Sequence, residues 1–189
     1  MRHDLAIRGG LVATATETFH ADIGIRDGRI ATLAESITDA DDVIDATGRI
    51  VMPGGIEAHC HIAQESGMGV MTSDDYESGS ISAAFGGNSC FVPFAAQKTG
   101  QSLASTIQTY DDRATLKSVV DWSYHLILTD PTPEVLAELP DVFARGITSF
   151  KVFMTYATRV SDAQFLDILS MAGRHGGLTM VHAENHDML

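Results

Sequence analysis

Short apolar runs alternate with helix-like segments from Pro53 onward, and this alternation constrains the fold more than any other feature of the sequence. Strand–helix repeats of this kind favour a parallel sheet with helices outside it. The predicted strands cover 55–61, 89–94, 122–128, 149–154 and 178–182, and the predicted helices cover 73–85, 102–118, 132–146 and 161–176. Right-handed crossovers leave two architectures, an open doubly wound sheet or a barrel.

Polar residues near the strand ends decide between these architectures. His59, Lys151 and His182 lie toward the carboxyl ends of predicted strands, where both architectures place functional sites. A dinucleotide-binding sheet would carry a glycine-rich loop after its first strand, and His59-Cys60-His61 stands there instead. We therefore predict an α/β fold built on a barrel. Because 189 residues are fewer than the roughly 250 typical of eight strands, we predict a partial TIM (β/α)8 barrel of about five strands.

Residues 1–53 have a different pattern, with short alternating strands and no helical segments. Asp27-Gly28 predicts a hairpin turn between two of these strands. We predict a small antiparallel segment that is the N-terminal part of a β-sandwich and needs partner strands to close. The predicted domains are therefore 1–53, for the sandwich part, and 54–189, for the N-terminal half of the barrel.

The charge of the chain limits its partners. A net charge of −13 and a pI near 4.8 argue against nucleic acid and against anionic membranes as partners. The sequence contains no apolar run of the roughly 18 residues that a transmembrane helix needs, and its first residues contain no secretory apolar core. Two cysteines in such a chain are expected to be reduced thiols, so we predict a cytoplasmic location.

Lys151 lies in the middle of the apolar strand 149–154. A buried ammonium is costly, so the simplest interpretation is that Lys151 pairs with an acid or extends its amine to water. The histidines on two other strands suggest a shared metal site instead. An ammonium would repel a cation, but an amine that captures carbon dioxide becomes a carbamate, whose two oxygens can bridge two cations.

His59 and His61 are two residues apart in a strand, so both can face the barrel interior and bind one ion, while Cys60 faces the helices. His182 would bind a second ion. Two ions about 3.5–4 Å apart can activate water for attack on a carbonyl. Tyr156, five residues after Lys151, could donate its O–H to the developing oxyanion, or could simply occupy the loop after the strand.

Four segments together resemble one known family. They are 53–61 (PGGIEAHCH), 74–79 (DDYESG), 149–156 (SFKVFMTY) and 181–185 (VHAEN). In this order they are similar to the dihydropyrimidinase/D-hydantoinase group of the amidohydrolase superfamily, and the resemblance covers the whole chain.

The resemblance implies a metal-dependent hydrolase barrel and a sandwich built from both chain termini. It implies two divalent ions, most simply Zn²⁺, held by His59, His61 and His182 and bridged by carboxylated Lys151. It implies that Tyr156 binds the substrate carbonyl oxygen. The reaction is then the opening of a cyclic amide or imide, a dihydropyrimidine or a 5-substituted hydantoin, to an N-carbamoyl amino acid. A homo-oligomer, a tetramer in the family, is implied for the full-length protein.

Leu189 ends the sequence before the family's further histidine ligand and catalytic aspartate. We therefore expect the chain to be the N-terminal portion of such an enzyme and to be inactive alone. Two alternatives stay open. One is a non-catalytic scaffold with the same fold, although such relatives lose the metal ligands that are present here. The other is an allantoinase-like hydrolase.

Overall fold

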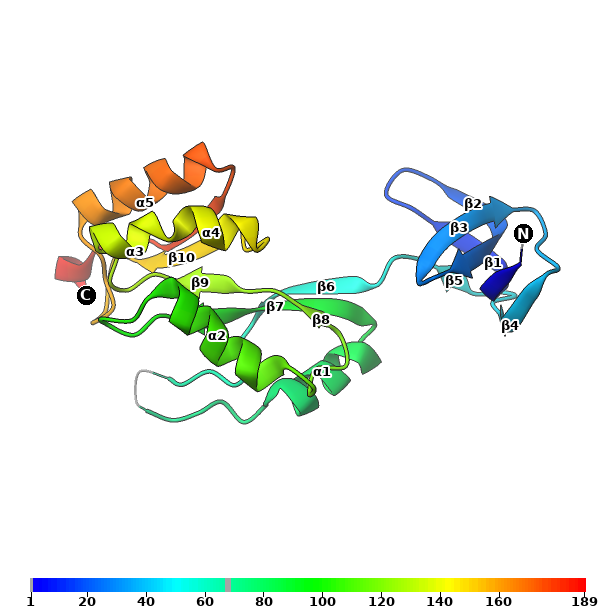
Figure 1. Cartoon of the computed structure of the whole chain (residues 1–189), viewed down its shortest axis with the longest axis horizontal. Helices are drawn as coiled ribbons and strands as arrows, with labels where there is room; N and C mark the ends of the chain where they lie inside the picture. The colour runs from blue at the N-terminus through cyan, green and yellow to red at the C-terminus, as the bar shows by residue number, and fades with distance from the viewer. Residues whose placement is uncertain (1, 67–68) are drawn as a thin grey trace. The chain divides into compact units, whose positions relative to one another are not determined.

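The computed structural model describes residues 2–66 and 69–189. The chain forms two compact units, Met1–Gly54 and Gly55–Leu189, and each has its own sheet (Figure 1). In the part of the chain that is described, no helix is long and apolar enough to cross a membrane.

The first unit is one sheet with the strand order β3-β2-β1-β4, in which β5 also pairs with β1. Its strands are β1 (His3–Ala13), β2 (Thr18–Arg26), β3 (Arg29–Ala34), β4 (Ala40–Asp45) and β5 (Ile50–Val51). The first three strands are antiparallel, as predicted. However, β4 and β5 run parallel to β1, because the chain crosses from β3 at one edge to the far side of β1 before β4 begins.

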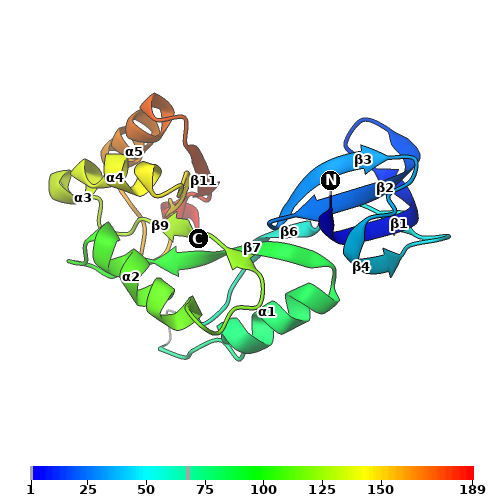
Figure 2. The same ribbon diagram turned by 45° about the vertical axis from the view of Figure 1, so that its right-hand side comes forward.

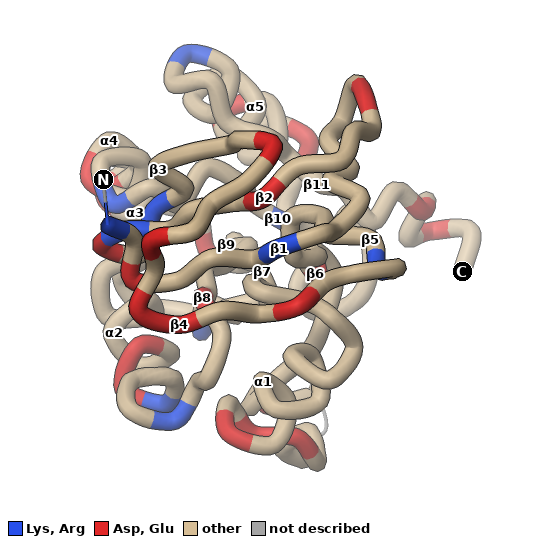
Figure 3. Tube along the Cα trace, turned by 90° about the vertical axis from the view of Figure 1, so that its right-hand side faces the viewer, with Lys and Arg blue, Asp and Glu red and all other residues tan. Residues whose placement is uncertain are grey.

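The β2–β3 turn confirms the predicted hairpin. Asp27 and Gly28 have φ values of 51° and 69°, the left-handed pair that two-residue hairpin turns require. Acidic residues concentrate along β4, which carries Asp41, Asp42 and Asp45 (Figure 3).

The second unit is a curled parallel sheet with the order β11-β10-β9-β7-β6, and the short β8 pairs with β7. Its strands are β6 (Gly55–Cys60), β7 (Asn88–Ala96), β8 (Asp121–Trp122), β9 (His125–Ile127), β10 (Ser149–Phe153) and β11 (Leu178–His182). This half-barrel confirms the predicted fold class. The predicted strand 122–128 is interrupted between β8 and β9, where the Tyr124 ring lies in the core and its hydroxyl donates to Asp111 at 2.9 Å.

Helices lie on the outside of this sheet (Figures 1 and 2). They are α1 (Tyr76–Phe85), α2 (Leu103–Ala114), α3 (Pro133–Ala137), α4 (Leu139–Ala144) and α5 (Asp162–Arg174), and the 3-10 turn η1 (His186–Met188) follows β11. The predicted helix 132–146 is two helices, because Pro140 stands in the first turn of α4 and cannot supply an interior N–H. Thr132 and Ser161 cap α3 and α5.

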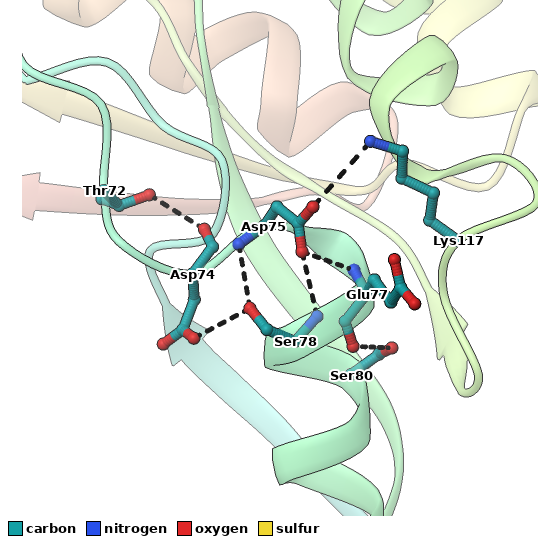
Figure 4. Close-up of polar contacts among 7 residues, drawn as sticks. All are labelled: Thr72, Asp74, Asp75, Glu77, Ser78, Ser80 and Lys117. Carbon is teal, nitrogen blue, oxygen red and sulfur yellow. Dashed lines mark hydrogen bonds and ion pairs between the residues drawn. The ribbon is translucent and has the colours of Figure 1, made fainter.

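Asp75 begins α1 with a capping box (Figure 4). Its carboxylate accepts hydrogen bonds from the backbone N–H groups of Glu77 at 3.0 Å and Ser78 at 2.9 Å. The Ser78 hydroxyl accepts from the Asp75 N–H at 3.2 Å and donates to Asp74 at 3.0 Å. The cap therefore fixes the end of the loop that leaves β6.

The core lies between the sheet and the helices. Phe91, Leu126, Phe150 and Val152 pack there with residues of α2, α4 and α5 such as Ile107. Because side chains alternate across a strand, the intervening residues face the opposite side of the sheet, which we call the inner face. His59, His61, Phe94, His125, Lys151 and His182 belong to this face by that alternation.

Candidate metal centre

Four aromatic rings form a cluster on β6, β7, β9 and the residue that follows β6, which we call the paired-histidine cluster. It contains His59, His61, Phe94 and His125. The centroid of the Phe94 ring lies 4.8 Å from that of His59 and 5.0 Å from that of His61, and those two imidazoles are 5.7 Å apart. Both predicted ligands therefore pack against the same Phe94 ring.

Hydrogen bonds orient this pair. The Nδ1–H of His61 donates to the Gln64 side-chain oxygen at 2.6 Å, which leaves Nε2 free to bind a ligand. The backbone N–H of His59 donates to Glu57 Oε1 at 2.9 Å. Cys60 packs against the helix-side core, as predicted, and burial together with the charge of Glu57 raises the pKa of its thiol to about 11. Cys60 is therefore a packing residue.

A second group, which we call the Lys151 cluster, lies on β10, β11 and the loops after them. It contains Lys151, Phe153, Tyr156, His182 and Glu184. The Lys151 ammonium lies 5.2 Å from the centroid of the Phe153 ring. Phe153 pairs with His182 across the strands, and their rings stack at 5.5 Å. These contacts bring three of the predicted site residues into one group.

Glu184 links the imidazole and the phenol of this cluster. Its carboxylate accepts from His182 Nε2 at 2.7 Å and from the Tyr156 hydroxyl at 3.4 Å. The Tyr156 ring lies 5.1 Å from the His182 ring and is 53% exposed. With Nε2 engaged, the Nδ1 atom of His182 is the nitrogen that could bind an ion. Tyr156 has a φ of 70°, a left-handed conformation that is uncommon outside glycine and that marks a constrained turn.

The two clusters share the inner face but lie on different strands. Within residues 2–66 and 69–189, none of the hydrogen bonds, ion pairs or ring contacts joins His59 or His61 to Lys151 or His182. In the same residues, no three His, Cys, Asp or Glu side chains come together to hold one ion. The ligand set His59, His61, Lys151 and His182 therefore stays a prediction, as does the bridging carbamate.

A cleft of about 880 Å³ opens beside the Lys151 cluster. Gln64, which is bonded to His61, lines it, and so do Phe153 and Tyr156 from the Lys151 cluster. Arg113 and Tyr110 also line the cleft. The Arg113 guanidinium lies 4.8 Å from the centroid of the Tyr110 ring and donates to the Ala63 carbonyl at 2.6 Å. A small cyclic molecule fits a cleft of this volume.

Three residues of the site were not predicted from the sequence, namely Gln64, His125 and Glu184. Gln64 and Glu184 lie three and two residues after a predicted ligand, so a search for side chains that orient histidines could have found them. His125 is the one polar side chain on the inner face of β9. The alternation of side chains within that strand could have assigned it to this face. His186, four residues after His182, lies in η1 after β11, and its Nδ1 is 3.4 Å from the Thr155 hydroxyl oxygen.

Comparisons with known proteins agree with this architecture. No protein-family model matches the chain. The D-hydantoinase of Geobacillus stearothermophilus is 43% identical over 187 residues, which are 97% of this chain and 40% of that protein. The dihydropyrimidinase of Arabidopsis thaliana is 35% identical, over 97% of this chain and 35% of its own length. The solved dihydropyrimidinase of Brevibacillus agri NCHU1002 matches with a TM-score of 0.90, 40% identity, and coverage of 96% of this chain and 40% of that one.

The half-barrel agrees with these relatives, and the solved structures that it matches include D-hydantoinases. More particularly, the chain is homologous over 97% of its length to the N-terminal portion of D-hydantoinases and dihydropyrimidinases. It spans about 40% of the length of these relatives.

Proposed function

We propose that the protein to which this chain belongs is a metal-dependent hydrolase that opens cyclic amides, a dihydropyrimidine or a 5-substituted hydantoin, to N-carbamoyl amino acids. The observation that supports this most is the placement of His59, His61, Lys151 and His182 on one face of a half-barrel. The names of the relatives, D-hydantoinase and dihydropyrimidinase, denote cyclic-amide hydrolases.

The donor set fits divalent ions such as Zn²⁺. Imidazole nitrogens suit zinc, and His61 Nε2 and His182 Nδ1 are the atoms left after each ring has made its orienting hydrogen bond. His59 and His61 would hold one ion, His182 the other, and carboxylated Lys151 would bridge them. Bound ions would supply an activated water and polarise the scissile carbonyl.

The position of Tyr156 supports a role in substrate binding. The residue lines the cleft, and the hydrogen bond from its hydroxyl to Glu184 is long, at 3.4 Å. Giving up such a bond costs little, so the hydroxyl can turn to donate to a carbonyl oxygen that becomes negative during the reaction. Lys151 lies two residues before Phe153, whose ring also lines the cleft.

The test uses the protein at its natural length, assayed with dihydrouracil, a 5-substituted hydantoin and allantoin, with metal content measured by mass spectrometry. We expect two ions per chain and turnover of one of the first two substrates. Lys151→Ala should lose both the ions and the turnover, whereas Lys117→Ala, at an exposed lysine 3.9 Å from Asp75, should keep both. Wild-type metal content in Lys151→Ala would show that the lysine does not bridge the ions.

The alternatives predict other outcomes. Turnover of allantoin alone would identify the allantoinase-like hydrolase, and a protein without bound ions or turnover would identify the non-catalytic scaffold. A homo-oligomer and a cytoplasmic location remain further proposals for the natural-length protein, and both are open to direct measurement by light scattering and cell fractionation.

A further inference from the structure

Pro93 stands inside β7, a strand that has β6 on one side and β9 on the other. Proline has no backbone N–H and is usually restricted to edge strands or bulges. The β6–β7 pairing is irregular at this point, since Glu57 pairs with Phe91 and Cys60 pairs with Pro93. Three steps along β6 thus match two steps along β7, which is a bulge.

The carbonyl of Ala58 lies in this bulge. Glu57 and Cys60 hold the regular pairs on either side of it, so Ala58 and His59 lie outside the regular register. The amide position of residue 93 faces β8 and β9 instead, because the Phe91 carbonyl two residues earlier accepts from the Ser123 N–H at 3.2 Å. A segment that leaves the ladder next to two metal-ligand candidates needs another hydrogen-bond donor to hold its conformation.

His125 supplies such a donor from β9, across β7. Its Nε2 lies 2.9 Å from the Ala58 carbonyl oxygen, and its Nδ1 lies 2.5 Å from the Ser149 hydroxyl. A carbonyl can only accept, so Nε2 carries the proton and Nδ1 accepts from Ser149. The residue is only 8% exposed, and burial lowers the pKa of its imidazole, in keeping with a neutral ring.

The same ring is packed against the cluster that it supports. Phe94 lies 5.2 Å from His125 on one side and 4.8 Å from His59 on the other. His125 therefore contacts the backbone immediately before His59 and, through Phe94, the side chains of the pair.

We propose that His125 is a positioning residue that donates to the Ala58 carbonyl within the bulge, and so fixes the β6 conformation that directs His59 and His61 to the inner face. The hydrogen bond does not depend on the proposed function, but its role in metal binding rests on that function.

Two substitutions distinguish the two hydrogen bonds of the His125 imidazole. In His125→Gln, the side-chain amide N–H can occupy the place of Nε2–H and reach Ala58. In His125→Asn, the shorter amide can reach Ser149 but not Ala58. We expect His125→Asn to lower metal affinity about tenfold or more, the usual effect of removing a residue that orients ligands, and His125→Gln to stay near wild type. Ser149→Ala, which keeps the Nε2–H donor, is the matched control and should also stay near wild type.

The Asn and Gln variants also separate the proposed hydrogen bond from a general packing defect, because both replace the same buried ring. Equal losses of metal affinity in these two variants would overturn the proposal.

Hydrogen exchange gives a readout that does not depend on metal or activity. In the natural-length protein, the peptide that covers 55–61 should exchange faster in His125→Asn than in the wild type, and at the wild-type rate in His125→Gln. If the wild type binds no ions but this exchange pattern appears, the proposed function fails and the role of His125 stands. If the wild type binds ions and the pattern is absent, the role of His125 fails alone.

Discussion

The paired-histidine cluster and the Lys151 cluster share the inner face of one half-barrel, but different kinds of contact hold them. In the first, Phe94 is 2% exposed and His125 is 8% exposed, and these two buried rings support the exposed His59 and His61. In the second, Tyr156 is 53% exposed and the Glu184 side chain is 45% exposed. Strands and buried rings thus fix one cluster, whereas loop residues after β10 and β11 complete the other. We expect the first to be preformed and the second to depend more on what it binds.

Substituting a predicted metal ligand should have the largest effect and should distinguish the two clusters. His61→Ala should remove the ion that the pair would hold, whereas His182→Ala should leave that ion in place, since the pair is oriented without β11. Both variants should lose turnover. Metal content of the natural-length protein measures the difference.

His20, an exposed histidine of β2, supplies the control, and His20→Ala should keep all ions. If His61→Ala and His182→Ala lose the same number of ions, the clusters form one cooperative site, and the contrast between a preformed and a ligand-dependent cluster is wrong.

The central phenylalanine of each cluster tests the difference in packing. Phe94→Ala removes a fully buried ring and should cost about 3–5 kcal/mol of stability. Phe153→Ala removes a ring that is only partly buried and lines the cleft, so the cost should be about 1–2 kcal/mol. Denaturant unfolding of the two variants measures both values.

Equal costs in that experiment would mean that the Lys151 cluster is packed as tightly as the other. A change in the denaturant slope would mean that the unfolding is no longer two-state, and then the comparison should be made by hydrogen exchange.

Tyr156→Phe removes one hydroxyl from the more open cluster. Because the bond from this hydroxyl to Glu184 is long, at 3.4 Å, stability should change little. If the hydroxyl stabilises an oxyanion, kcat should fall by about 10²–10³, with a smaller change in KM. An unchanged kcat would assign Tyr156 the structural role of a constrained loop residue, which its positive φ also allows.

Local periodicity in the sequence predicts one part of the fold and site, and long-range pairing determines the rest. The alternation in β6 placed His59 and His61 on one face and Cys60 on the other, and the structure agrees. The parallel pairing of β4 with β1 depends on a crossover, which short-range alternation does not encode. The role of His125 depends on a bulge between two strands that are far apart in sequence, so no pattern within either strand shows it.

The loops that leave the two clusters end in different helix caps, and this gives the smallest expected effect. The loop after His61 ends at Asp75, whose pKa is held below its ordinary value of 3.8, first by the Ser78 backbone N–H (Figure 4). The loop after Lys151 ends at Ser161, a cap that does not titrate. A carboxyl with a lowered pKa stabilises the fold above its ordinary value, and this contribution is lost as the pH falls through the lower, folded-state value.

Acid should therefore loosen the start of α1 before the start of α5. Asp75→Asn keeps a capping side chain without the titration, so the wild type should melt higher than this variant near pH 6, and the difference should shrink below pH 3.8. Ser161→Asn, a matched change at the other cap, should show a difference from wild type that does not depend on pH in this range. A constant difference for Asp75→Asn would mean that the charge of Asp75 does not contribute to the cap, and the contrast between the two loops would then rest on packing alone.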